Sequence, residues 1–240
     1  MQTQHIKMKK LAGIFSDFIE LFFPGVCVTC GNRLINKEDF VCMDCWLDLP
    51  VTHFGSDDNN KVAQLFWGQV NITHATSYFS YKKGSRYQQL IYAIKYRGMK
   101  ELGFEIGKRF GSELSEIADL GAIDLIVPVP LHPRKQKKRG YNQSEWIARG
   151  IADAMNLPVI TNNLIREVHT STQTNKSRFE RWKNVETIFG IEKPEVFEGK
   201  HVLLIDDVIT TGATLEACAM QLLKINNVSV SIATLAFADM

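Results

Sequence analysis

The sequence predicts an α/β protein, built on a parallel sheet with flanking helices and preceded by a small cysteine-rich module. Strand-like and helix-like segments alternate from about residue 125 onward, which is the order that builds such a sheet. Four cysteines gather within residues 27–45. Net charge also changes along the chain, from −3 over residues 1–60 to +5 over residues 61–240. These three observations predict two domains of different character.

Composition excludes several classes of protein. The hydrophobic share of 45% is enough for a folded core, and the ordinary charge content argues against disorder, a fibrous repeat or a coiled coil. Because the net charge is only +2, any surface that binds nucleic acid must be a local basic patch. Polar turn formers fill residues 55–60, so we place the boundary between domains 1–60 and 61–240 there.

The N-terminus carries an apolar stretch, Leu11 to Phe23, behind three lysines. Asp17 and Glu20 interrupt it and no small-residue cleavage site follows, which argues against a signal peptide. It is also shorter than the about 20 apolar residues that a membrane span needs. Helical spacing predicts an amphipathic helix that docks on its own protein, with a membrane-surface helix as the alternative. We therefore expect a cytoplasmic protein without a membrane span.

The four clustered cysteines form two Cys-x-x-Cys pairs separated by eleven residues, namely Cys27, Cys30, Cys42 and Cys45. Two such turns supply a tetrahedral sulfur shell, which predicts a zinc-ribbon-like module with structural zinc, Zn²⁺. Four thiolate ligands leave no open position for catalysis, and disulfides would be reduced in the cytoplasm. Because the segment has few apolar residues beyond its first helix, it needs the metal to fold. Cys218 lies on an apolar helix face and is expected in the core.

The second domain shows the segments of a parallel sheet in order. An apolar run that ends in Pro-x-Pro predicts a buried strand that stops there. The predicted strands cover Leu125–Val129, Pro158–Ile165, His201–Ile205 and Val228–Phe237, and helices begin at Asn142 and Thr214. Ligands of such sheets bind beyond the carboxyl ends of the strands, which is where we expect the site.

Residues 202–214 place two adjacent carboxylates at such a strand end, followed by a short Thr/Gly loop that opens a helix. Backbone N–H groups of this kind of loop, together with the partial positive charge of a helix N-terminus, hold a phosphate. The carboxylates then need another part of the ligand, and the vicinal hydroxyls of a ribose can donate to both. The predicted ribose and phosphate site comprises Asp206, Asp207, Thr210, Thr211, Gly212, Ala213 and Thr214.

The stretch 202–214 resembles the 5-phosphoribosyl-1-pyrophosphate (PRPP) binding motif of type I phosphoribosyltransferases. Residues 127–134 (Val-Pro-Val-Pro-Leu-His-Pro-Arg), 139–144 (Arg-Gly-Tyr-Asn-Gln-Ser) and 94–98 (Ile-Lys-Tyr-Arg-Gly), with the four-cysteine module, resemble the ComF family over nearly the whole chain. The resemblance implies a type I phosphoribosyltransferase-like domain joined to a zinc module, in a bacterial cytoplasmic protein linked to DNA uptake and natural competence. No rival nucleotide motif matches, since residues 103–108 fall one residue short of a P-loop.

The resemblance also implies which residues hold the pyrophosphate. In the family this group is held by the loop after the first strand and covered by a mobile loop, here residues 169–185. The expected contacts are Leu131, His132, Arg139, Lys176 and Arg178. Mg²⁺ would accompany PRPP, and phosphoribosyl transfer would depend on positioning and neutralisation of the leaving pyrophosphate. The acceptor is unidentified, and His132 and His169 are the candidates for a general base.

The basic segment Arg134–Arg139 leaves three interpretations open. Its five positive charges can contact pyrophosphate, follow a single-stranded DNA backbone with Tyr141 and Trp146 stacking on bases, or form a solvated turn. Trp146 lies on an apolar helical stripe, which favours a place in the core. Two alternatives to a transferase follow. One is a non-catalytic PRPP-site protein that binds single-stranded DNA or a competence partner; the other is an adaptor whose zinc module docks a DNA-uptake protein.

Overall fold

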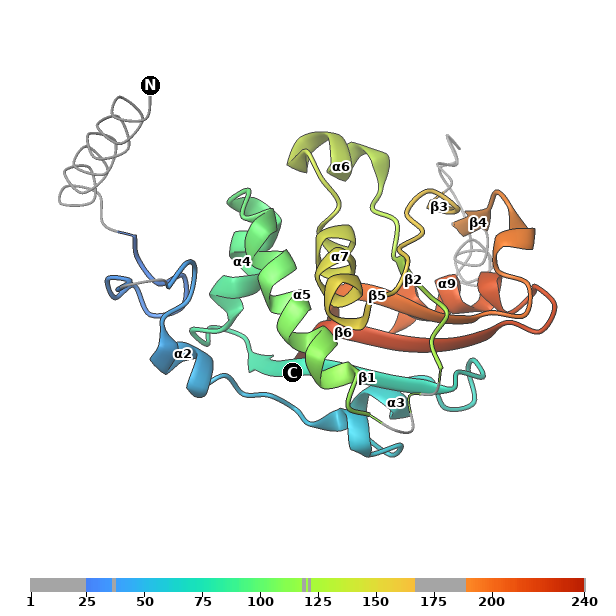
Figure 1. Cartoon of the computed structure of the whole chain (residues 1–240), viewed down its shortest axis with the longest axis horizontal. Coiled ribbons are helices and arrows are strands. Elements are labelled where there is room, and N and C mark those ends of the chain that lie inside the picture. Colours follow the sequence, from blue (N-terminus) through green and yellow to red (C-terminus); the bar gives the residue numbers. More distant parts are fainter. Residues whose placement is uncertain (1–24, 36–37, 118–119, 121, 167–188, 240) are drawn as a thin grey trace, which may run out of the picture. The chain divides into compact units, whose positions relative to one another are not determined.

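The computed structural model describes residues 25–35, 38–117, 120, 122–166 and 189–239 (Figure 1). Its internal contacts divide the chain into two compact units, Met1–Leu49 and Pro50–Met240. This division precedes the boundary predicted after residue 60. Part of the stretch interpreted as a linker belongs to the fold of the second unit, because the buried Asn60 donates to the carbonyl oxygen of Ala75 at 2.8 Å. The predicted N-terminal amphipathic helix lies outside the described residues.

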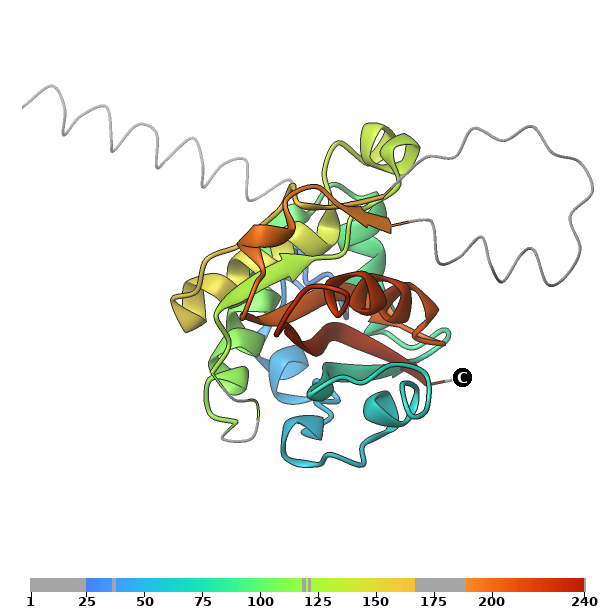
Figure 2. The same ribbon diagram turned by 90° about the vertical axis from the view of Figure 1, so that its right-hand side faces the viewer.

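The second unit contains the predicted parallel sheet (Figures 1 and 2). Its strand order is β1 (His74–Lys82), β6 (Ser229–Asp239), β5 (His201–Ile209) and β2 (Leu125–Pro128), and each neighbouring pair is parallel. The expected strand over Pro158–Ile165 is shorter than predicted. Only Val159 bridges to β2, and the chain then turns into β3 (Leu164–Arg166), which pairs antiparallel with β4 (Phe189–Ile191).

Strand β1 has no counterpart among the predicted strands. It is buried along most of its length, but Thr76 and Ser77 interrupt the apolar pattern and are each only 1% exposed. A buried strand of mixed polarity does not appear as a continuous apolar run, which is the signal that identifies the other central strands.

Helices cover both faces of the sheet, as Figures 1 and 2 show. One face carries α7 (Gln143–Met155), which packs on α5 (Lys100–Leu114), with α4 (Gln88–Tyr96) beside α5. The other face carries α9 (Ala213–Leu222) and the short α3 (Lys61–Gln64), which share one hydrophobic core with Phe66 and Phe197. Other short helices in the described part of this unit include η1 (Phe54–Ser56), α6 (Pro133–Arg139) and η3 (Pro194–Val196). Cys218 is fully buried in this core, as predicted.

Glycines allow α5 and α7 to approach at backbone contact distance. A Cβ atom added at Gly111 would lie 2.7 Å from the carbonyl oxygen of Ile151, and one added at Gly150 would overlap the carbonyl oxygen of Phe104. The glycines of residues 103–108 therefore lie in a helix-packing surface rather than a phosphate-binding loop. This contact positions α7, whose first turn faces the end of β5.

No helix among the described residues is long and apolar enough to cross a membrane.

Candidate functional site

The first unit brings the four predicted cysteines together. The sulfur atoms of Cys27, Cys30, Cys42 and Cys45 all lie within 4.8 Å of one another, and none is in a disulfide. The Sγ atoms of Cys30 and Cys42 are 3.7 Å apart. Tetrahedral ligands at the usual zinc–sulfur length of about 2.3 Å are separated by about 3.8 Å, so the cluster has the size and donor chemistry of a four-thiolate metal site.

Local backbone geometry explains why this short segment forms such a cluster. The first cysteine pair lies in a turn that Gly31 completes with a positive φ of 78°, while its N–H donates to the carbonyl oxygen of Cys27 at 2.8 Å. The second pair occupies the start of α2 (Met43–Leu47), for which Cys42 is the N-cap. The Glu38 carboxylate accepts hydrogen bonds from the N–H groups of Ile35 and Met43, both at 2.8 Å, and so connects the two turns.

In the second unit, the two motif carboxylates lie within β5, which ends at Ile209, whereas the predicted strand His201–Ile205 stopped before them. The strand is longer than predicted because its pairing with β6 continues to Ile209. Asp206 is half-buried and accepts hydrogen bonds from the Ser144 hydroxyl and from the Asp207 N–H, each at 2.8 Å. Burial, and secondly the adjacent Asp207 carboxylate, raise the pKa of Asp206 to about 7. A cation or a hydroxyl donor beside Asp206 would favour the charged form of this carboxyl group.

A lysine from a distant helix completes this group. The Lys95 Nζ atom, on α4, lies 2.9 Å from Oδ1 of Asp207, and the two side chains are 22% and 7% exposed. The other oxygen, Oδ2 of Asp207, is buried and has no hydrogen-bond partner within the described part of the chain. Tyr81, near the end of β1, is close enough for both charges to affect it: burial raises its pKa, Lys95 lowers it and Asp207 raises it. The sequence analysis did not identify Lys95 or Tyr81 as site residues.

The predicted phosphate loop joins β5 to α9. Its residues surround a small open cavity together with Asp206 and Leu215. Gly212 has a positive φ of 78° and is the N-cap of α9, and Phe66 lies directly beneath it, 3.3 Å from where a Cβ would stand. Thr210, Thr211, Ala213 and Thr214 are exposed. The loop thus leaves its N–H groups and hydroxyls accessible at the positive end of a ten-residue helix, which suits a phosphate.

The segment 139–144 holds three parts of this site in place. The Tyr141 hydroxyl donates to the carbonyl oxygen of Ile94 and so anchors the end of α4 that carries Lys95. The Asn142 side chain caps α7 by accepting from the Ser144 N–H, and it also donates to the carbonyl oxygen of Val129 beyond β2. Ser144 contacts Asp206. Of these three roles, only the helix cap at Asn142 was predicted from the sequence. The other two residues, Tyr141 and Ser144, belong to the same motif, which is the signal that could have identified them.

The structure describes three of the five residues that were predicted to contact pyrophosphate. Leu131 and His132 lie between β2 and α6, half-exposed, and the His132 Nδ1 atom accepts from the Arg134 N–H at 3.1 Å. That bond makes His132 the N-cap of α6. Arg139 hydrogen-bonds Gln143 and stacks 5.5 Å over the ring of Tyr96. Lys176, Arg178 and His169 lie outside the described residues.

The aromatic residues around α6 differ from the expected arrangement. Trp146 is half-buried rather than fully in the core, because it lies under the Lys100 ammonium, 4.5 Å from its ring centre. The Tyr141 hydroxyl is occupied by its bond to α4. Instead, Tyr92 and Tyr96 on α4 are 47% and 67% exposed, with ring centres 5.1 Å apart. The accessible aromatic surface near the basic helix thus comes from α4.

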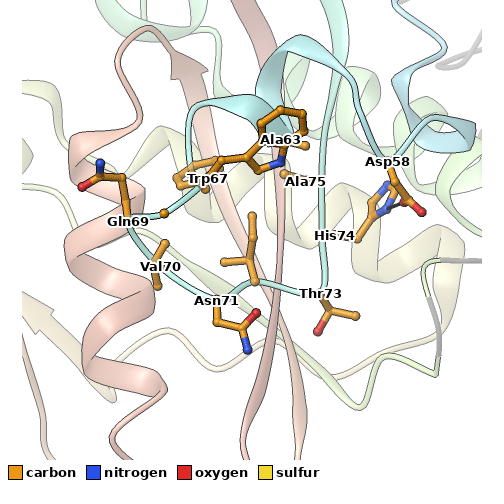
Figure 3. A pocket seen from close by; sticks show the side chains of 12 residues that line it. Asp58, Ala63, Trp67, Gln69, Val70, Asn71, Thr73, His74 and Ala75 are labelled. Atoms are coloured by element: carbon orange, nitrogen blue, oxygen red, sulfur yellow. Dashed lines mark ion pairs between the residues drawn. The ribbon is translucent and has the colours of Figure 1, made fainter.

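A larger cavity, of about 370 Å³, lies elsewhere in the second unit (Figure 3). Its lining comes from Asp58 and from residues 63–75, which lead from α3 into β1. Trp67 is 58% exposed at its edge. At the other end, as Figure 3 shows, His74 faces Asp58, with Nδ1 and Oδ1 3.4 Å apart. None of the predicted ligand-binding residues lines this cavity.

Comparison with known proteins shows which proteins the chain resembles. The phosphoribosyl transferase domain family matches residues 126–239. "Competence protein F" of Haemophilus influenzae is 35% identical over 48% of this chain and 51% of its own length, so that match spans about half of the relative. "DNA utilization protein YhgH" of Escherichia coli is 26% identical over 87% of this chain and 88% of its own. "Competence protein ComFC" of Bacillus subtilis is 28% identical over 83% and 78%.

The three relatives carry competence or DNA-utilization names, and the domain match covers β2, β5, the phosphate loop and β6. The described residues also contain the four-cysteine cluster and the parallel sheet that the sequence predicts. These findings support the resemblance of the chain to the ComF family of competence-associated proteins, and its second unit has a phosphoribosyltransferase-like fold.

Proposed function

We propose that the protein binds PRPP together with Mg²⁺ and transfers the phosphoribosyl group with release of pyrophosphate, in a pathway connected to DNA uptake. The observation that carries this proposal is that Asp206, whose side chain accepts from the N–H of the adjacent Asp207, lines one cavity with the exposed Thr/Gly loop at the start of α9. The loop would hold the 5-phosphate, while the carboxylates would accept the ribose hydroxyls. Mg²⁺ would supply positive charge to the pyrophosphate when bound, and the chain's own groups would orient the sugar.

Titration calorimetry with Mg²⁺ and PRPP tests the binding step. We expect saturable heat from the wild type and its loss in the double variant Asp206→Asn/Asp207→Asn. Asp124→Asn is a suitable control, because Asp124 is an exposed carboxylate that binds the start of β5 rather than its end. Pyrophosphate release in the presence of mixed bases and amines then tests transfer. An absence of binding heat at millimolar PRPP would reject the proposal.

The cysteine cluster would hold structural Zn²⁺. Its four thiolates provide complete tetrahedral ligation, so the metal would support the fold of residues 25–49 and take no part in transfer. Metal content measured by atomic emission should be one zinc per chain.

A second candidate function is binding of single-stranded DNA without catalysis. It is favoured by the exposed Tyr92 and Tyr96, which lie beside the guanidinium groups of Arg97 and Arg139 and could stack on bases. Fluorescence anisotropy with a labelled oligonucleotide should then show salt-sensitive affinity that falls when Arg134, Lys137 and Arg139 are neutralised together. A Tyr92→Leu/Tyr96→Leu variant separates stacking from charge, and unchanged affinity in both variants would exclude this function.

A further inference from the structure

The Lys95–Asp207 ion pair is the feature of the site that the proposed function leaves unexplained. It joins α4 to the end of β5 at 2.9 Å, in an environment where both side chains are largely buried. Burying two charges costs roughly as much as their attraction returns, so such a pair contributes little to fold stability by itself. Because Asp207 leaves its second carboxylate oxygen without a partner in the described residues, the pair is also incompletely satisfied. A ligand that donates to this oxygen would complete the pair.

The stereochemistry of the proposed ligand provides one. In PRPP the pyrophosphate is attached to C1 in the α configuration, on the same ring face as the 2- and 3-hydroxyls. A side chain that contacts the carboxylate accepting those hydroxyls is thus close to the leaving pyrophosphate. Oδ2 of Asp207, which is buried and has no partner in the described residues, would accept a ribose hydroxyl of the bound ligand while Oδ1 keeps Lys95. An ammonium has three N–H donors, so Lys95 retains donors for an anionic oxygen.

We propose that Lys95 is a pyrophosphate-binding residue, contributed by α4 and positioned by Asp207. This inference rests on the proposed function and adds to it a residue outside the loops to which the resemblance assigns this role. The Lys95 ammonium would contact both the ribose-binding carboxylate and the leaving group. It would therefore stabilise the negative charge that develops on the pyrophosphate as the C1–O bond breaks.

The anchoring of α4 is consistent with this role. The Tyr141 hydroxyl binds the carbonyl oxygen of Ile94, the residue before Lys95, and Arg139 stacks on Tyr96, the residue after it. The residues on both sides of Lys95, one through its backbone and one through its ring, are thus contacted by the segment that also places Ser144 against Asp206. Lys95 and the carboxylates therefore keep a defined separation, as a site for one rigid ligand requires.

The test compares two ligands on the same Lys95→Met preparation. Titration calorimetry with Mg²⁺ measures affinity for PRPP and for ribose 5-phosphate, which lacks the pyrophosphate. We expect the PRPP affinity to fall at least about tenfold, the usual effect of losing a hydrogen bond from a charged group, while ribose 5-phosphate affinity changes less than about threefold. Lys83→Met, which removes an exposed lysine just beyond β1, should leave both affinities unchanged.

The ratio of the two affinities separates the possible outcomes. An equal loss for both ligands would show that Lys95 only supports the fold, and no loss for either would show that it does not contact pyrophosphate; each result overturns the inference. Failure of the wild type to bind either ligand would instead reject the proposed function. If Lys95→Met does not fold, Lys95→Gln carries the same test, because its amide keeps a hydrogen bond to Asp207 without the charge.

Discussion

The two candidate sites of this protein are built in opposite ways. The candidate metal site takes all four of its thiols from residues 27–45, and two turns with a short helix bring them together. The candidate phosphoribosyl site takes side chains from β1, α4, α7 and β5, and Lys95 is more than 100 positions from Asp207 in the sequence. A site made of neighbouring residues depends only on the folding of the short segment that contains them. A site made of distant residues depends on the packing of the entire domain.

The largest effect is expected from removing one metal ligand. Cys27→Ser should abolish metal binding and unfold residues 25–49, because binding of a structural zinc ion contributes about 10–16 kcal/mol in small metal-dependent folds. Limited proteolysis should then produce new cuts within these residues, while the cleavage pattern of the second unit stays that of the wild type.

Cys218→Ser is the matched control, since Cys218 is buried in the core of the second unit and is no part of the cluster. It should retain the metal. Retention of metal by Cys27→Ser, or cleavage throughout the chain, would contradict the view that this site is local.

The phosphoribosyl site should instead respond to packing far from its ligands. Gly150→Ala would push a methyl group into the backbone of α5 and shift α7, which carries Ser144. Overpacking of this kind costs about 1–3 kcal/mol, and urea denaturation measures it. The affinity for PRPP should also fall, although residue 150 touches no ligand.

Gly103→Ala provides the comparison within the same helix pair. Its added Cβ would meet Ile94 at 3.5 Å, an ordinary contact, and alanine is favoured over glycine in helices by about 1 kcal/mol. We expect this variant to be at least as stable as the wild type. Equal destabilisation by both substitutions would disprove the close-approach argument.

The smallest effect is a difference in pH dependence. Because the folded pKa of Asp206, about 7, exceeds its ordinary value of 3.8, the folded state holds the proton more tightly between these values. The contribution of Asp206 to the free energy of unfolding therefore falls as pH rises from about 4 to 7. Metal binding by the cysteines should change in the opposite direction, since protons compete with the metal for thiolates at low pH.

Urea denaturation at pH 5 and pH 8 checks this for the second unit. Asp206→Asn should reduce the difference between the two pH values, and the affinity for Mg²⁺ and PRPP should rise with pH through about 7 in the wild type only. A pH profile that Asp206→Asn leaves unchanged would show that this carboxyl does not titrate in that range.

Prediction from sequence succeeded where the signal was contiguous. The strand before Asp206, the helix after Gly212 and the core position of Cys218 all follow from short patterns of apolar residues, carboxylates and a turn glycine. It failed at β1, where buried Thr76 and Ser77 break the apolar run, and at Pro158–Ile165, where a single bridge replaces a strand. The boundary after residue 60 stays a prediction, although Asn60 packs within the second unit.

The sequence by itself determined the chemistry that is available: four thiols at metal-ligand spacing, two carboxylates at a strand end, and a loop with accessible N–H groups. Only the tertiary structure decided what accompanies them, namely Lys95 against Asp207, Ser144 against Asp206, and Tyr141 holding α4. The physical reason is that hydrophobic periodicity specifies which face of an element is buried, but not which distant element supplies its neighbours. Those neighbours are set by the close contact of α5 with α7 and by the order of the strands.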